Sequence, residues 1–243
     1  MDKRINNIYI DFLNKSIQSD ANDWQSVKIE TNNPMYEIQN LFFELDFNDP
    51  IEQINPDVEW CKIHFQERVG GSPLNPGESY KAWPYYYKGI NNDNLFRSND
   101  GIFSHTYMER FWPKYDENNN LRYGIRYLYG DLNDVIERLY KNKSTRQAFL
   151  GIWHPEDQSN NNVRVPCTIG YWFKVNNNKL DCTYLIRSCD IVRHFRNDIY
   201  LTYLLMRFVA VSIGVEIGKL NMWVGSLHSF KSDFYYIKNT IIK

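Results

Sequence analysis

The chain has 243 residues, and 43% of them are hydrophobic, which is enough to bury one large core. Its formal net charge of -1 at pH 7 argues against nucleic acid or an anionic membrane as the main partner. The longest apolar run, residues 199–215, contains Thr202, Arg207 and Ser212, so it is too polar to span a bilayer, and the chain begins without an apolar signal region.

The cysteines and histidines indicate the compartment and argue against a metal site. The four cysteines, Cys61, Cys167, Cys182 and Cys189, form no CxxC pair, which is typical of a protein in a reducing cytosol. The five histidines are scattered along the chain, so no metal site is predicted. We therefore expect a cytoplasmic protein that uses no metal.

The first part of the chain is predicted to contain two helices and two strands. Residues 5–17 carry apolar side chains at helical spacing, and residues 27–30 and 41–47 have the pattern of strands around a turn at 32–34. Residues 57–67 should form the second helix, because a proline precedes them and two glycines follow.

Residues 72–116 are rich in Pro, Tyr, Asn and Trp and show no clear periodicity. Within them, residues 84–116 are predicted to be an insertion into a single domain that spans residues 1–243. This insertion could form a lid over a site or part of an interface, and the sequence leaves both alternatives open.

The second part of the chain is predicted to alternate helices and strands. The expected elements are an amphipathic helix at 132–140, a buried strand at 148–153, a hairpin of strands 171–175 and 180–186 around an Asn-rich turn, and a buried helix at 199–215.

The hairpin carries the residues that point to chemistry. Cys167 follows a proline just before the first strand, and Arg187-Ser188-Cys189-Asp190 stands at the end of the second. A thiol facing an arginine and a serine at strand ends has the residue types of a nucleophile beside an anion site. The alternative is that Cys167 only packs, since free cysteines are among the most buried residues.

These motifs resemble those of the thymidylate synthase superfamily, and more closely its phage deoxycytidylate hydroxymethylase branch. The shared pattern is Pro-Cys, a hairpin, and then Arg-Ser-x-Asp twenty residues after the cysteine, matched here by Cys167 and Arg187 to Asp190. Residues 225–228 are similar to the family's Gly-(Asp/Ser)-x-His element, and Thr145-Arg146 to its Ser-Arg-Arg phosphate element. The likeness is good from about residue 145 to 234.

Earlier in the chain the resemblance is patchy. Tyr123 with Gly124 is similar to the family's Tyr-Gly, Trp83 to its tryptophan on the folate side, and Asp57 to Trp60 to its Glu-x-x-Trp helix. No arginine stands in residues 31–37, where the family has a mobile arginine loop that holds the phosphate.

The resemblance implies an α/β (α+β) fold in which helices flank a mixed β-sheet and the helix at 199–215 is central and buried. It also implies a homodimer formed back to back through the sheets. In such a dimer Arg146 would reach the phosphate of the neighbouring subunit's nucleotide, whereas the alternative is an ordinary surface charge.

The resemblance further assigns roles at the reacting centre. Cys167 would add to C6 of a pyrimidine nucleotide, because a thiolate adds there reversibly and thereby activates C5. Asp57 would relay protons, with Glu59 as the alternative, although a carboxylate at this place usually complements a helix dipole. Tyr123 would face the reacting carbon.

The remaining implied contacts are to the nucleotide and the folate. Arg187 and Ser188 would bind the phosphate, and His228 a ribose hydroxyl. Phe230 stands where the family usually has Tyr, so one hydrogen bond to the sugar is missing and the choice between CMP and dCMP is open. Asp190 and Trp83 would contact the folate.

Asp198 is the position that bears on the choice of base. Thymidylate synthases carry Asn eight residues after the motif's aspartate, and an amide can both donate to and accept from uracil. A carboxyl accepts from the cytosine 4-amino group and, if protonated, donates to N3, so Asp198 favours cytosine. The alternative is that Asp198 caps a helix that begins at Ile199.

The function expected from this resemblance is hydroxymethylation of C5 of dCMP or CMP, with 5,10-methylenetetrahydrofolate as the co-substrate. Two alternatives stay open: a nucleotide-binding relative without catalysis, because the chain ends fifteen residues after His228, and a thymidylate synthase acting on dUMP. The expected partners are thus a pyrimidine nucleoside monophosphate, a folate and a second copy of the chain, without nucleic acid or membrane.

Overall fold

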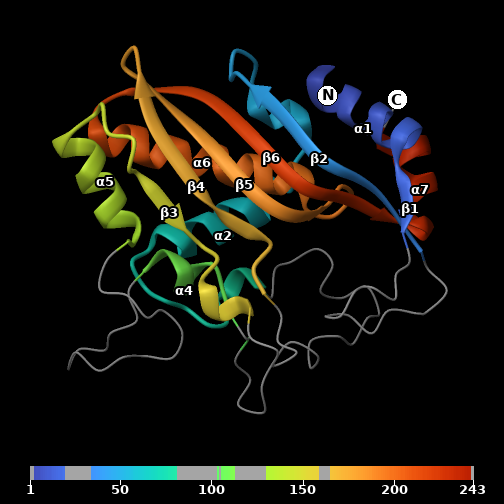
Figure 1. The fold of residues 1–243 in the computed structure, drawn as a ribbon, viewed down its shortest axis with the longest axis horizontal. Helices are drawn as coiled ribbons and strands as arrows, with labels where there is room; N and C mark the ends of the chain where they lie inside the picture. Colours follow the sequence, from blue (N-terminus) through green and yellow to red (C-terminus); the bar gives the residue numbers. More distant parts are fainter. Residues whose placement is uncertain are drawn as a thin grey trace.

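The computed structural model describes residues 3–19, 34–80, 103, 105–112, 130–158 and 165–241. A six-stranded mixed sheet in the order β1-β2-β6-β5-β4-β3 forms its centre (Figure 1). Its strands are β1 (Ile17–Ser19), β2 (Met35–Leu45), β3 (Phe149–Gly151), β4 (Thr168–Asn176), β5 (Lys179–Asp190) and β6 (Glu216–Phe230). Only the β5–β6 pair is parallel among these neighbours, and the others are antiparallel.

Helices precede, connect and follow these strands. They are α1 (Lys3–Lys15), α2 (Val58–Val69), α4 (Met108–Phe111), α5 (Leu132–Lys141), α6 (Phe195–Ile213) and α7 (Lys231–Tyr236). Short turns of helix occur at η2 (Ile51–Ile54), η3 (Glu78–Tyr80), η4 (Pro155–Gln158) and η5 (Ile237–Ile241). The α/β architecture with a mixed sheet, as predicted, is confirmed.

Most local predictions agree with these elements. The β4–β5 hairpin turns at Asn177 and Asn178, whose φ angles of 48° and 58° lie in the left-handed region that Asn tolerates. The α5 helix begins with a capping box in which Asp131 and Asp134 bond each other's backbone amides. The strand predicted at 27–30 lies outside the described residues.

The central helix α6 begins earlier than predicted. It starts at Phe195 rather than Ile199, follows His194 as its N-cap residue, and ends at Ile213, where Gly214 with a φ of 67° is the C-cap residue. The Asp198 amide donates to the His194 carbonyl at 2.8 Å, so Asp198 lies inside the first turn. The alternative that Asp198 caps this helix is therefore wrong.

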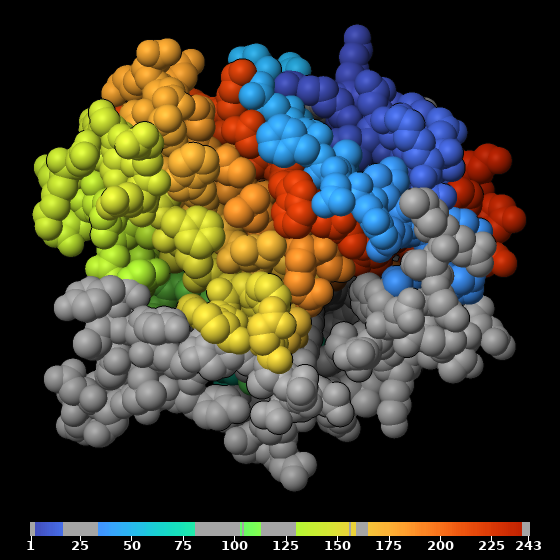
Figure 2. Space-filling model, in the orientation of Figure 1, coloured from blue at the N-terminus to red at the C-terminus, as the bar shows by residue number. Residues whose placement is uncertain are grey.

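The two faces of the sheet differ. Helices α2 and α6 lie on one face, where their apolar side chains join those of the strands in the main core (Figure 1). The other face presents its strands without a covering helix in the view of Figure 2. Large side chains are exposed there, among them Phe42 at 61% and Trp172 at 38%.

No helix in the described part of the chain has both the length and the apolar character that a membrane crossing requires.

Candidate active site

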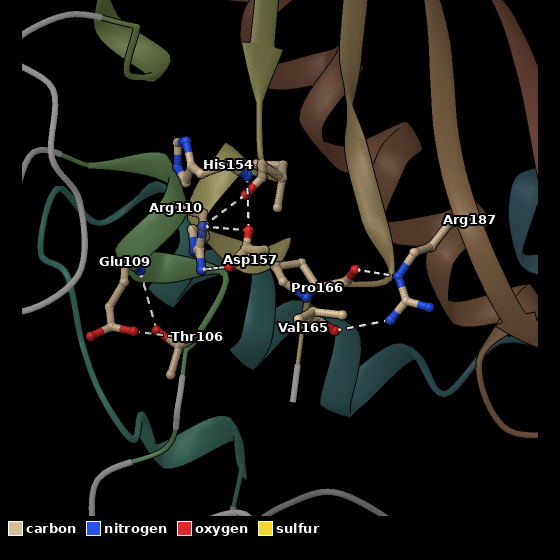
Figure 3. A network of polar contacts seen from close by, with 9 residues as sticks. Thr106, Glu109, Arg110, His154, Asp157, Val165, Pro166 and Arg187 are labelled. Carbon is tan, nitrogen blue, oxygen red and sulfur yellow. Dashed lines mark hydrogen bonds and ion pairs between the residues drawn. The ribbon is translucent and has the colours of Figure 1, made fainter. Parts of the chain in front are cut away.

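Arg187 secures the segment that carries Cys167. Its Nε donates to the Pro166 carbonyl at 2.9 Å and its Nη2 to the Val165 carbonyl at 3.2 Å (Figure 3). The Arg187 amide also donates to the Cys167 carbonyl at 2.8 Å. Cys167 is partly exposed just before β4. Arg187 of β5 thus fixes the backbone of residues 165–167 through three hydrogen bonds to their carbonyls.

Asp198 lies on the first turn of α6 and faces a crowded interior. Its side chain keeps some exposed area, yet burial among protein atoms raises its pKa to about 6, while the charge of Arg68 lowers it. The buried Cys189 thiol donates to its Oδ2 at 3.6 Å. Asp198 therefore changes protonation close to neutral pH.

Three tyrosines surround the hydroxyl of Thr168, the residue next to Cys167. Thr168 Oγ1 lies 2.9 Å from the Tyr184 hydroxyl and donates to the Tyr107 hydroxyl at 3.3 Å. The rings of Tyr171 and Tyr184 stack at 4.7 Å. Burial, followed by the charge of Cys167, raises the pKa of Tyr107, so this phenol stays protonated beside the thiol.

Asp57 is placed at the N-terminus of α2 and contacts α6. Its Oδ1 accepts the Trp60 amide at 3.0 Å, as an N-cap does, and its own amide donates to Asn197 Oδ1 at 2.8 Å. Glu59, by contrast, has a side chain that is 88% exposed and lies 3.8 Å from Lys62. Of the two carboxylates considered, Asp57 is the one close to the α6 turn that carries Asp198.

Asp190 is engaged in the turn between β5 and α6. Its oxygens accept the amides of Val192 and Arg193 at 2.9 and 3.0 Å and the Arg193 guanidinium at 2.6 Å. Burial opposes ionisation, but Arg193, His228 and His194 together lower the pKa of Asp190. A contact of this carboxylate with folate stays a prediction.

His228 and Phe230 are buried near the end of β6. The His228 ring packs edge-on against Phe230 at 6.5 Å, and burial lowers the pKa of His228, while the charge of Asp190 opposes this effect. His228 is the register partner of Asp190 on β5 and of Glu37 on β2. Its predicted contact with a ribose is untested.

The other predicted contact residues are dispersed. Ser188 is half-buried on β5 opposite Ser226, and Arg146 is exposed before β3, where its carbonyl accepts the Trp172 indole at 3.1 Å. Trp83 and Tyr123 lie outside the described residues. The roles of all four stay predictions.

The described part of the predicted insertion packs onto the core. Arg110 of α4 forms a buried ion pair with Asp157 at 2.8 Å and donates to the Ile152 carbonyl at 3.3 Å (Figure 3). Thr106 and Glu109 bond each other beside it. Residues 105–112 therefore form a fixed wall beside β4, and this wall supplies Tyr107.

Sequence reasoning did not identify Arg68, His64 and Tyr107 as site residues. Arg68 is 5% exposed at the end of α2, bonds His64 Nε2 at 2.9 Å, and lies 4.3 Å from the centre of the Tyr107 ring. A cationic residue in a last helical turn usually only complements the helix dipole. The one sequence signal was Arg68 itself, on the face of α2 shared by Trp60, Cys61 and His64.

Comparisons with known proteins identify the family. The family model described as thymidylate synthase matches residues 87–243, more than half of the chain. A protein of Bacillus phage SP01 named deoxyuridylate hydroxymethyltransferase is 32% identical over 148 residues, which are 56% of this chain and 36% of that protein. A putative thymidylate synthase of Methanocaldococcus jannaschii is 27% identical over 209 residues, 79% of this chain and 90% of that protein.

A solved structure agrees in fold. The thermostable thymidylate synthase A from Bacillus subtilis superposes with a TM-score of 0.69 at 17% identity and covers 98% of this chain and 82% of that one. The chain thus belongs to the thymidylate synthase family, a family of one-carbon transferases. It spans about a third of the length of the phage relative and most of the length of the archaeal one.

Proposed function

We propose that this protein transfers a one-carbon unit to C5 of a cytosine nucleotide, dCMP or CMP, and releases the hydroxymethyl product. The observation that supports this proposal is Asp198 in the first turn of α6, with a pKa raised to about 6. A protonated carboxyl accepts from the 4-amino group of cytosine and donates to N3. A bound base that excludes water would raise this pKa further and favour the protonated form.

The residues around Cys167 are suited to the covalent steps of such a reaction. Cys167 Sγ adds to C6, which makes C5 nucleophilic enough to attack the methylene carbon of 5,10-methylenetetrahydrofolate. Loss of the C5 proton and of tetrahydrofolate leaves an exocyclic methylene, to which water adds as the thiolate leaves. Asp57 is proposed as the proton relay, and Tyr123 as the residue facing the reacting carbon.

The phosphate and sugar contacts are proposed from the same site. Arg187 donates from Nε and Nη2 to backbone carbonyls, and its Nη1, which bonds none of the described residues, is proposed to bind a phosphate oxygen together with the Ser188 hydroxyl. His228 is proposed to bond the ribose and Asp190 with Trp83 to contact the folate. Phe230 has no hydroxyl that could bond the sugar, so CMP and dCMP are both proposed as substrates.

A homodimer formed through the open face of the sheet is part of the proposal. Phe42 and Trp172 are exposed apolar side chains on that face, and Arg146 is exposed near Trp172. In the dimer Arg146 would cross to the partner's nucleotide. Mixing inactive Cys167→Ala with inactive Arg146→Ala chains should restore activity in the mixed dimers, and a mixture that stays inactive would contradict the crossing.

Two alternatives concern the base and the chemistry. The phage relative is named for deoxyuridylate, and other relatives are named thymidylate synthase, so a uracil nucleotide is the second candidate substrate. A nucleotide-binding protein without catalysis is the third. We take Asp198 to favour cytosine over uracil, because a carboxyl that loses its proton still accepts from the cytosine 4-amino group but cannot donate to uracil O4.

Tritium release from C5-labelled dCMP, CMP and dUMP with 5,10-methylenetetrahydrofolate tests the proposal. We expect release from a cytosine nucleotide, loss of release in Cys167→Ala, and no dihydrofolate absorbance. Cys182→Ala, which removes a buried thiol inside the core rather than at the site, is the control. Release from dUMP with dihydrofolate would indicate a synthase, and nucleotide binding without any release would indicate the non-catalytic relative.

A further inference from the structure

Arg68 is a buried cation that has no acidic partner among the residues that the structure describes. It is 5% exposed, and no carboxylate in the described part of the chain lies within ion-pair distance of its guanidinium. Its Nη1 donates to the Tyr171 hydroxyl at 3.4 Å, and its buried Nε has no hydrogen-bond partner among the described residues. Burying an unpaired charge costs free energy of folding, so a buried arginine of this kind is a candidate for a functional role.

The direct partners of Arg68 are neutral. His64 Nε2 accepts from Arg68 at 2.9 Å, so His64 must donate from Nδ1 to Ser79 Oγ, 2.8 Å away, and Ser79 in turn bonds the Glu67 carboxylate. Burial first, and the charge of Arg68 second, lower the pKa of His64 and keep the ring uncharged. Because these partners are neutral, they do not cancel the charge of Arg68, and this charge can influence other groups of the candidate active site.

Those groups are Tyr107 and Asp198. The guanidinium carbon lies 4.3 Å from the Tyr107 ring centre, a cation–π distance, and the Trp112 indole donates to the Arg68 carbonyl at 2.7 Å. Arg68 therefore holds both ends of the segment from Tyr107 to Trp112 on α2. Because the Tyr107 oxygen accepts from Thr168, its own hydrogen is available to a bound molecule.

Helix α2, which carries Arg68, contacts the turn of α6 that carries Asp198, because the Cys61 thiol donates to the Asn197 carbonyl at 3.9 Å. The titratable groups that interact with Asp198 come from each element around it: Cys61 and Arg68 of α2, Tyr107, Tyr171 of β4, and Tyr184 and Cys189 of β5. Burial keeps the thiols and phenols among them protonated and neutral. Arg68 is thus the one charged side chain in this set besides Asp198.

We propose that Arg68 is a positioning residue of the candidate active site, which holds the Tyr107 hydroxyl beside Thr168 and Cys167 and acts as the counter-charge of Asp198. The catalytic half of this proposal, the positioning of the Tyr107 hydroxyl, rests on the function proposed above. The electrostatic half, the effect of Arg68 on Asp198, concerns the protein without substrate and can be tested separately.

The electrostatic half is tested by titrating the Asp198 carboxyl with carbon-13 NMR in nucleotide-free protein, the signal being assigned with Asp198→Asn. Arg68→Met should raise the Asp198 midpoint by about one pH unit, because a nearby opposite charge lowers the pKa of a carboxyl by about one to three units. Arg68→Lys, which keeps the charge, should retain most of the wild-type midpoint. The exposed Arg138→Met on α5 is the matched control. An unchanged midpoint in folded Arg68→Met would overturn the proposal.

The catalytic half is tested with Tyr107→Phe, which keeps the ring and removes the hydroxyl. We expect tritium release to fall by about tenfold or more, with nucleotide Kd changed less than about twofold, because a positioned proton donor acts on the reacting complex. Unchanged release in Tyr107→Phe would overturn the role of this hydroxyl. Absence of release in the wild type would refute the proposed function, while the NMR result would still decide the role of Arg68.

Discussion

The Asp57 amide donates to Asn197 Oδ1 at 2.8 Å and so joins the start of α2 to the first turn of α6. This bond spans 140 positions of sequence and lies next to Asp198. It places the proposed proton relay, Asp57, and the proposed base-reading carboxyl, Asp198, at two helix N-termini that this hydrogen bond joins.

Asn197→Ala should weaken this junction. Loss of one partly buried hydrogen bond costs about 1 kcal/mol, which corresponds to a fall in Tm of about 2 to 4 °C for a chain of this size. The rate of C5-proton release should fall further than this stability loss explains, because Asp57 and Asp198 lose their relative placement. Thermal unfolding and tritium release together measure both effects, and an active, destabilised variant would contradict the second.

The pKa of Asp198 makes its contribution to stability depend on pH. The folded protein binds this proton more tightly than the unfolded chain, because the pKa rises from 3.8 to about 6. The contribution of Asp198 to the free energy of unfolding is therefore greatest below pH ~4, and it is lost as the pH rises through about 6. Asp198→Asn, which cannot ionise, should match the wild type at pH ~4 and exceed it above pH ~7 by up to about 3 kcal/mol. A difference in Tm that is the same at every pH would contradict this account.

Asp198→Asn should also change the preferred base. An amide complements uracil with its nitrogen toward O4 and its oxygen toward N3–H, and it must exchange the places of these two atoms to meet cytosine. We expect the ratio of kcat/KM for cytosine over uracil nucleotides to fall by at least about 100-fold. Glu137→Gln on the exposed face of α5 is the control. An unchanged ratio would remove Asp198 from base recognition.

The ion pair of Arg110 and Asp157 should stabilise the wall that carries Tyr107. Their side chains are 9% and 11% exposed, so Asp157→Asn leaves a nearly buried guanidinium without its charge partner. Breaking such a pair costs about 3 to 5 kcal/mol. The double variant Arg110→Met, Asp157→Leu should recover part of this loss, because it leaves no unpaired charge. Denaturant unfolding of the three proteins measures the difference, and a double variant weaker than Asp157→Asn would argue against burial as the cause.

Local patterns in the sequence were sufficient to predict most of the helices and strands, and to predict that Cys167 and Arg187 lie close together in the site. The β4–β5 hairpin follows from alternation and from two asparagines at the turn, and α5 from apolar spacing and its acidic N-terminus. Cys167 and Arg187 could be associated because a hairpin returns the chain to where it started. Helix α6 was placed correctly but begun four residues late, since nothing apolar marks its first turn apart from Phe195.

What the sequence by itself determined is the set of chemical groups carried by the hairpin and by α6, because each lies within one or two neighbouring elements. The tertiary structure alone decided that Arg68, His64 and Tyr107 join them, and that Asp57 contacts Asn197. These contacts link α2, the segment before α4, β4 and α6, and spacing along a chain carries no information about which distant faces pack together. Burial likewise, not residue type, set the charge state of Asp198, because the pKa of a carboxyl depends on the atoms that replace its water.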